Sequence, residues 1–183
     1  MMTNIIESFI EYCDRLMIAI EERGPLPRSI MKDSATRKKY SKSVHDLIDK
    51  VRNNSDNCIE HATEKHLNYQ SAKRFFKPNK TVSYFIKGAD LIDLTCKALI
   101  GSENEIIYLL YNGYQDLTIT FGYQMYIGKS HFGEDPDDAN DEYVSTIRIG
   151  ISKEGETKKG APILKIHTAY PIPEKDRIFW LNR

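Results

Sequence analysis

Two histidines near the middle of this 183-residue chain have side chains suited to acid–base chemistry. His61 and His66 enclose the stretch Ala-Thr-Glu-Lys. A histidine titrates near neutral pH, so either ring could serve as a general acid or a general base. Residues five apart on a helix differ by about 140° around its axis, so the two rings are not expected to share a face or a metal ion. We therefore expect one ring to face a reactive site while the other packs or is solvated.

A second group of polar side chains lies near the C-terminus, on an expected strand over residues 162–170. Strict alternation places Thr168 and Tyr170 on one face, and Lys165 and His167 on the other. A twist or a β-bulge would be needed to bring His167 onto the face of Thr168. The two hydroxyls can donate hydrogen bonds to an anionic group.

Between these groups, residues 65–80 contain five bases and no acid, with three aromatic residues interleaved. With such a pattern, the basic side chains could bind phosphates and the aromatic rings could stack on nucleobases. The pattern is equally typical of a helix with buried aromatic rings and solvated basic side chains. The bases are Lys65, Lys73, Arg74, Lys77 and Lys80. An acidic run over residues 134–142 is expected to be a solvated loop or a docking strip for a basic partner.

The elements that would position these side chains change in character along the chain. Apolar spacing of three and four residues predicts helices in the first part, and Ile-, Val-, Thr- and Tyr-rich segments predict strands in the second. Asn112-Gly113 predicts a hairpin turn between the first two strands. The order favours an α+β fold with N-terminal helices followed by a twisted antiparallel sheet. The expected helices are 4–22, 41–51, 57–68 and 83–100, with a helical turn at 70–77, and the expected strands are 105–111, 116–127, 143–152 and 162–170.

Composition limits the class of protein. Twenty-six basic residues balance 26 acidic ones, which argues against a protein that coats nucleic acid with its whole surface. No apolar run approaches the roughly 20 residues needed to cross a bilayer. Three distant cysteines predict neither a disulfide framework nor a zinc site. We expect a cytoplasmic protein without a membrane partner.

The two histidine-bearing segments together resemble small bacterial ribonuclease toxin domains. The His-x-x-x-Lys-His element at 61–66 and the Thr-Ala-Tyr-Pro ending at 168–171 are similar to the RNase A-like toxin domain of contact-dependent inhibition proteins. The layout is also similar to the barnase–EndoU–colicin–RelE toxin group. The resemblance spans about residues 57–172, and Leu67-Asn68 departs from the glycine-containing turn of that family. It implies a helical extension over 1–56 and a ribonuclease-like domain over 57–183.

This resemblance implies a metal-independent endoribonuclease that needs no cofactor. Attack by the ribose 2′-OH would give a 2′,3′-cyclic phosphate, with RNA as substrate, tRNA being one candidate, and a cognate inhibitor protein as partner. His66 takes the catalytic histidine role, Arg74 the cation role with Lys77 as its alternative, and Thr168 and Tyr170 match the ending. His167 lies outside the match but could supply a second acid or base. The residues expected to bind substrate are His61, Lys73, Lys77 and Lys165.

Two other interpretations remain open at this point. The chain could be a non-catalytic interaction protein, such as an immunity protein, an antitoxin or an RNA-binding module on the same fold. It could also be another metal-independent transferase that acts on NAD or on a protein. No glycine-rich loop of the Rossmann or P-loop type is present, which removes the commonest nucleotide sites.

Overall fold

The computed structural model describes residues 24–53, 59–135 and 141–181. Helices precede antiparallel strands that form two three-stranded sheets, so the predicted α+β fold is confirmed. The helix expected over 4–22 lies outside the described residues. The elements are α2 (Arg28–Lys32), α3 (Ser34–Arg52), α4 (Glu60–His66), α5 (Tyr69–Lys73), β1 (Val82–Phe85), α6 (Leu91–Gly101), α7 (Glu103–Tyr111), β2 (Asp116–Gly122), β3 (Gly128–His131), β4 (Asp141–Val144), β5 (Thr146–Glu156), β6 (Pro162–Ile172) and a 3-10 turn η2 (Glu174–Asp176).

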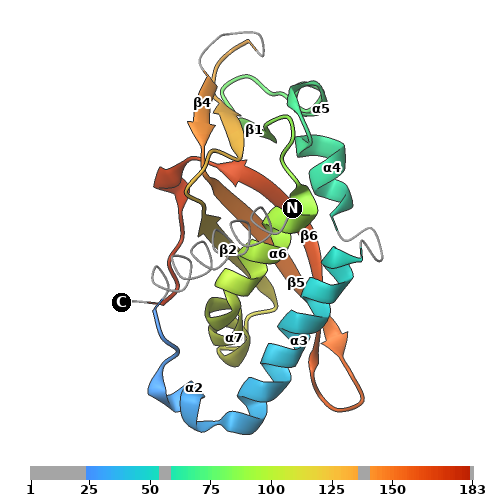
Figure 1. The fold of residues 1–183 in the computed structure, drawn as a ribbon, viewed down its shortest axis with the longest axis vertical. Helices are drawn as coiled ribbons and strands as arrows, with labels where there is room; N and C mark the ends of the chain where they lie inside the picture. Colours follow the sequence, from blue (N-terminus) through green and yellow to red (C-terminus); the bar gives the residue numbers. More distant parts are fainter. Residues whose placement is uncertain (1–23, 54–58, 136–140, 182–183) are drawn as a thin grey trace, which may run out of the picture.

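The larger sheet has the strand order β2-β5-β6, with β6 at its edge. Alternate residues of β5, namely Ile147, Ile149 and Ile151, are fully buried on its inner face. Helices α3, α6 and α7 cover that face (Figure 1). Burial of these β-branched and aliphatic side chains is the main source of stability. The opposite face of β5 and β6 is left for polar side chains.

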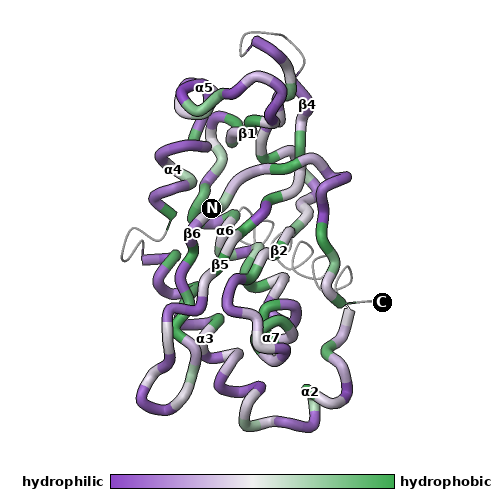
Figure 2. The backbone as a smooth tube through the Cα atoms, turned by 180° about the vertical axis from the view of Figure 1, so that it is seen from behind, coloured by the Kyte–Doolittle hydropathy of each residue, from purple (hydrophilic) through white to green (hydrophobic). Residues whose placement is uncertain are grey.

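Helix α3 belongs to the same hydrophobic core as the larger sheet. Its apolar residues recur every three or four positions, and all four are buried in that core: Val44, Leu47, Ile48 and Val51. Its first turn is capped by the Asp33 carboxylate, which accepts a hydrogen bond from the backbone N–H of Thr36 (3.1 Å). Figure 2 shows hydrophilic colouring around the start of α3, and α7 is hydrophobic only after its polar first turn. The domain boundary expected after residue 56 falls within 54–58, outside the described residues, and stays a prediction.

The smaller sheet has the order β1-β3-β4 and lies at one end of the molecule beside α4 and α5 (Figure 1). Its strands pair in antiparallel register, with Tyr84 opposite Lys129 and Lys129 opposite Tyr143. Helix α4 contacts both β1 and β6, so it bridges the two sheets. This bridge places a histidine-bearing helix along the edge of β6.

The helix predicted over 83–100 is wrong in its first half. Strand β1 occupies Val82–Phe85, and α6 begins only at Leu91. Gly88 adopts a φ of +90°, which breaks the helix, and the Asp90 side chain accepts a hydrogen bond from the Asp93 N–H (3.0 Å) to start a new one. Tyr84 and Phe85 are buried in the small sheet.

The strand predicted over 105–111 is also wrong, because this segment is helix α7. Ile106, Ile107, Leu109 and Leu110 are all buried, which a helix achieves by facing two apolar layers. Gly113 has a φ of +81°, and its N–H bonds to the Leu110 carbonyl (3.1 Å). Asn112-Gly113 therefore ends a helix instead of closing a hairpin.

Candidate active site

A β-bulge in β6 arranges the polar residues at the end of the chain. Ile166 pairs with Ile151, whereas Thr168 pairs with Gly150, so His167 is the extra residue on its strand. The bulge breaks the alternation, and the predicted division of faces is therefore wrong. Four side chains share the outward face: Lys165, His167, Thr168 and Tyr170.

Gly150 makes room for the bulge. A Cβ atom built on Gly150 would lie 2.4 Å from His167 Nε2 and 2.7 Å from Thr168 Cγ2. The His167 ring therefore lies over the glycine, on the same face as Thr168. Neither His167 nor the Thr168 hydroxyl forms a hydrogen bond with the described residues, so both are available to a ligand.

His66 lies at the last position of α4 and faces the outward surface of β6. Its ring stacks on that of Tyr170, with centroids 5.0 Å apart and planes 22° apart. Its Nδ1 lies 2.7 Å from the Ser83 carbonyl, which can only accept, so Nδ1 carries the hydrogen and Nε2 keeps its lone pair. Burial lowers the pKa of His66, the Ser83 bond opposes this, and charge on His61 and Lys65 lowers it further. These features suit a general base at neutral pH.

His61 joins the same group, although helical geometry predicts otherwise. Its ring centroid lies 5.6 Å from that of His66, and α4 packs along β6. The two rings therefore lie close together, and the expectation that one faces the site while the other packs or is solvated stays a prediction. Burial, the charge of Lys65 and the charge of His167 lower the pKa of His61, against a raising effect of Glu64.

Arg148 is a member of the group that the sequence does not reveal. It lies on β5 directly opposite Tyr170. Its Nη1 donates to the Tyr170 hydroxyl (3.3 Å), and its Nη2 donates to the Asp176 carbonyl (3.2 Å). Because the guanidinium occupies a lone pair of the Tyr170 oxygen, the phenolic O–H remains free to donate to an anion. Only the strand register could have identified this residue, and single-sequence patterns do not give registers.

The bases expected from the 65–80 segment lie apart from this group. Arg74 caps the end of α5 and is exposed, and Lys77 is exposed in the following loop. Neither side chain forms a hydrogen bond, ion pair or ring contact with the described residues. Lys73 lies over the Tyr69 ring, with Nζ 5.8 Å from its centroid. Lys165 is on the outward face and pairs with Glu154 (3.5 Å). Their roles toward a substrate stay predictions.

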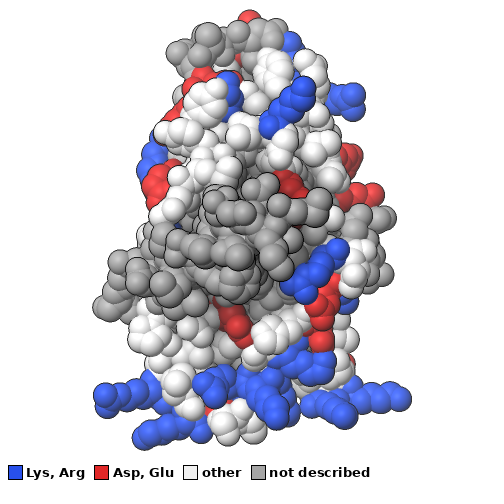
Figure 3. All heavy atoms as spheres, in the orientation of Figure 1, with Lys and Arg blue, Asp and Glu red and all other residues white. Residues whose placement is uncertain are grey.

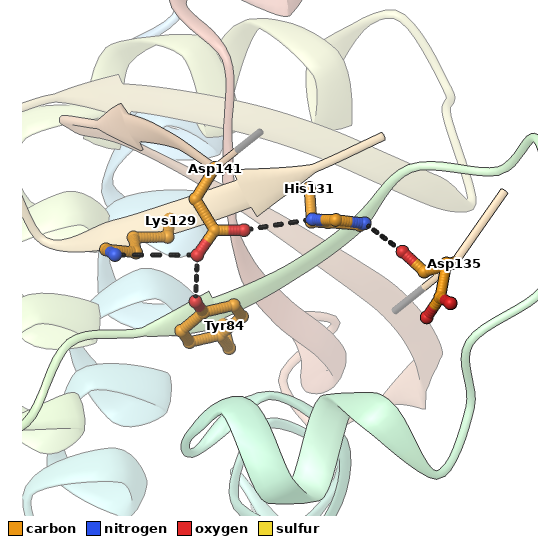
Figure 4. A network of polar contacts seen from close by, with 5 residues as sticks. All are labelled: Tyr84, Lys129, His131, Asp135 and Asp141. Carbon is orange, nitrogen blue, oxygen red and sulfur yellow. Dashed lines mark hydrogen bonds and ion pairs between the residues drawn. The ribbon is translucent and has the colours of Figure 1, made fainter. Parts of the chain in front are cut away.

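The smaller sheet holds a second polar network that the sequence does not predict (Figure 4). Asp141 accepts hydrogen bonds from the Tyr84 hydroxyl (2.6 Å) and from Lys129 Nζ (3.4 Å). His131, which is 2% exposed, places Nδ1 3.0 Å from the Asp141 carboxylate and Nε2 2.9 Å from the Asp135 carbonyl. The two ring nitrogens therefore link the Asp141 carboxylate to the Asp135 carbonyl. The network thus joins β1, β3 and β4 through hydrogen bonds to a buried histidine and its neighbours.

No group of three or more metal-binding side chains is found among the residues that the structure describes. In the same part of the chain, no helix combines the length and the apolar character that crossing a membrane requires.

Comparison with known proteins gives one similar structure. No family model matches the chain, and neither does any curated protein. A search of solved structures finds a chain of the CdiA-CT/CdiI complex from Y. kristensenii 33638. The two chains are 23% identical, the alignment covers 62% of this chain and 99% of that one, and the TM-score is 0.49.

Proposed function

We propose that this protein is a metal-independent endoribonuclease. The observation that carries the proposal is the β6 bulge, which gathers His167, Thr168 and Tyr170 on the face toward which His66 leans. Three histidines, two hydroxyls and a guanidinium are a set that can move protons and hold a phosphate without a metal ion.

In the proposed reaction His66 Nε2 removes the proton from a ribose 2′-OH. The O2′–P bond forms while the P–O5′ bond breaks, and a protonated His167 or His61 gives its proton to the leaving O5′. The products are a 2′,3′-cyclic phosphate and a 5′-hydroxyl end. Thr168 and Tyr170 donate hydrogen bonds to the phosphate oxygens as negative charge accumulates there.

The decisive experiment incubates purified protein with RNA in EDTA and identifies the product ends by mass spectrometry. The wild type should produce cyclic phosphate ends, and His66→Ala should reduce the rate by about 10²–10⁴-fold. His45→Ala is the matched control, because His45 is an exposed histidine on α3, outside the candidate site, that pairs with Glu103 (3.5 Å). Intact RNA with the wild type, or cleavage that EDTA abolishes, would remove the proposal.

We also propose that the enzyme is a toxin held in check by a cognate inhibitor protein. The resemblance of the 61–66 and 168–171 motifs to ribonuclease toxin domains supports this role. Induced expression in a bacterial host should stop growth with the wild type and spare it with His66→Ala. Equal growth of both strains would contradict the toxin role but would leave the proposed nuclease activity unaffected.

A non-catalytic interaction protein is the second candidate, favoured by exposed apolar side chains around the smaller sheet. Each is more than half exposed, and two of them, Tyr126 and Tyr143, have ring centroids 5.4 Å apart. Such side chains are typical of protein-binding surfaces. The four are Met125, Tyr126, Phe132 and Tyr143. Harmless expression together with intact RNA would favour this candidate.

A further inference from the structure

Basic side chains from separate segments gather at the end of the molecule opposite the smaller sheet. Figure 3 shows Lys and Arg side chains along that end, where α2, the start of α3 and the β5–β6 turn lie in Figure 1. We call this surface the basic end. It comprises six exposed residues: Arg28, Lys32, Lys38, Lys39, Lys158 and Lys159.

The fold brings the β5–β6 turn against α3. A Cβ atom on Gly160, in that turn, would lie 3.7 Å from Lys39 Nζ. The hydrogen bond from Lys153 is the main cause that lowers the pKa of Glu156, and the charge of Lys39 adds to it. Residues about 120 positions apart in the sequence therefore contribute to one positive surface.

The charge of the basic end is not neutralised locally. None of its six side chains forms an ion pair or a hydrogen bond with the described residues. The nearby acids have nearer partners: the Asp33 carboxylate caps α3, and Glu156 pairs directly with Lys153 (2.7 Å), the charge of Lys39 being a smaller influence on it. A cluster of free like charges costs stability through repulsion and attracts polyanions.

The basic end is continuous with the candidate active site along β6. The outward face of this strand leads from the β5–β6 turn past Lys165 to His167 and Thr168. At about 3.3 Å per residue, Gly160 and Thr168 are separated by about 25 Å along the strand. A stacked RNA strand with a rise of about 3.4 Å per nucleotide would cover that length with roughly seven nucleotides.

We propose that the basic end binds the phosphate backbone of the RNA whose bond is cut at the His66–Tyr170 site. This inference rests on the proposed ribonuclease function and specifies its substrate class. The preferred substrate is an RNA strand that extends about seven nucleotides or more to one side of the cleaved bond, not a dinucleotide. Lys158 and Lys159 make backbone contacts that do not depend on base sequence.

The test compares two variants with the same change of net charge. Lys158→Gln/Lys159→Gln removes two charges from the basic end, and Lys87→Glu changes the charge equally at an exposed position after β1. Kinetics are measured on a dinucleotide and on an RNA of about 20 nucleotides. Binding of the same RNA is measured by fluorescence anisotropy at several salt concentrations, with every protein carrying His66→Ala so that the RNA stays intact.

We expect the double variant to lower kcat/KM on the long RNA about tenfold, through a higher KM. It should also reduce the slope of the logarithm of the binding constant against the logarithm of the salt concentration by about 1.4, because each lost phosphate contact removes about 0.7. Its dinucleotide cleavage should equal that of the wild type, and Lys87→Glu should change neither. Equal effects of the two variants on the long RNA, or a parallel loss on the dinucleotide, would overturn the inference.

The binding arm separates this inference from the proposed function. If the wild type cleaves no RNA, the nuclease proposal fails. If RNA binding is nevertheless weakened by the double variant and not by Lys87→Glu, the basic end is still supported as an RNA-binding surface. Unchanged RNA binding would overturn it. Binding to anionic lipid vesicles that needs Lys158 and Lys159, without RNA binding, would also overturn it and assign the surface to a membrane.

Discussion

At the scale of single residues, the hydrogen bond from His66 Nδ1 to the Ser83 carbonyl determines what this ring can do. The bond fixes the tautomer, so a neutral His66 directs the lone pair of Nε2 away from β1. Burial then keeps the ring neutral at a pH where an exposed histidine would start to gain a proton. Orientation and protonation state are thus set by two separate causes.

The pH dependence of kcat/KM should report this lowered pKa. Because the pKa of His66 in the folded protein lies below its ordinary value of 6.5, the base form persists below that pH. Activity should therefore fall only as the pH drops through the lowered pKa, and the acidic inflection should lie below 6.5. A pH–rate profile in EDTA measures it. An inflection at or above the ordinary value would show that His66 is not the titrating base.

Arg148 should act through Tyr170 as a positioning residue. Tyr170→Phe removes the phenolic donor, and Arg148→Gln removes the guanidinium that holds its oxygen. We expect each change to reduce kcat by roughly tenfold to a hundredfold, and the double variant to lose little more than the worse single variant. Arg52→Gln, at an exposed arginine paired with Asp49, is the control. Fully additive losses would contradict coupling between the two side chains.

At the scale of elements, the β6 bulge and Gly150 form one structural unit. Gly150→Ala would place a methyl group 2.4 Å from His167 Nε2, so the ring must move from its position beside Thr168. We expect activity to fall by at least tenfold with the fold retained, since a displaced acid or base loses its proton-transfer geometry. Circular dichroism and RNA cleavage together test this. Ser152→Ala, next along β5 on the same face, should be nearly neutral.

The network of Figure 4 should stabilise the smaller sheet in a pH-dependent way. Burial alone would raise the pKa of Asp141, but hydrogen bonds from Tyr84, His131 and Lys129 outweigh it and hold the pKa below its ordinary value of 3.8. Ionised Asp141 therefore contributes stability above that value, and the contribution is lost as the pH falls through the folded-state pKa.

Asp141→Asn should lower the free energy of unfolding by about 1.5–3 kcal/mol at pH 7. The difference from the wild type should shrink as the pH falls below 3.8, where the wild-type carboxylate loses its advantage. Urea unfolding at a series of pH values measures both effects. Asp116→Asn, at an exposed position of β2, is the control. A constant difference across all pH values would contradict the assignment.

At the scale of the whole molecule, α3 is part of the core that supports the site. Leu47 is 1% exposed and packs in the core that the larger sheet and α6 share. Leu47→Ala should therefore destabilise the protein by about 2–5 kcal/mol in a single cooperative unfolding transition. Denaturant unfolding followed by tryptophan fluorescence, with Ala35→Gly as an exposed control in α3, measures this. An unchanged transition would show that the residues before 57 form a separable extension.

The sequence predicts much of the fold, and the reasons for the failures are physical. Helices α3 and α4 and strands β2, β5 and β6 follow from apolar spacing and β-branched composition. The sequence does not predict helix α7, because two pairs of aliphatic residues separated by Tyr108 fit a buried strand equally well. His66, Thr168 and Tyr170 come from short motifs, and the structure brings them together. Arg148, the bulge at His167 and the joining of Lys158 and Lys159 to the basic stretch of α2 and α3 depend on register and tertiary contacts, which no local pattern contains.

The extra residue in β6, His167, interrupts the regular pairing of this strand with β5. A chain that lacked His167 would pair Thr168 and Ile166 with the same partners as now, but as an uninterrupted ladder. Such a deletion would give a more regular sheet edge that no longer carries this imidazole. The protein keeps an irregular strand at a place where its backbone could easily be regular, and the irregularity places the His167 imidazole on the outward face beside Thr168.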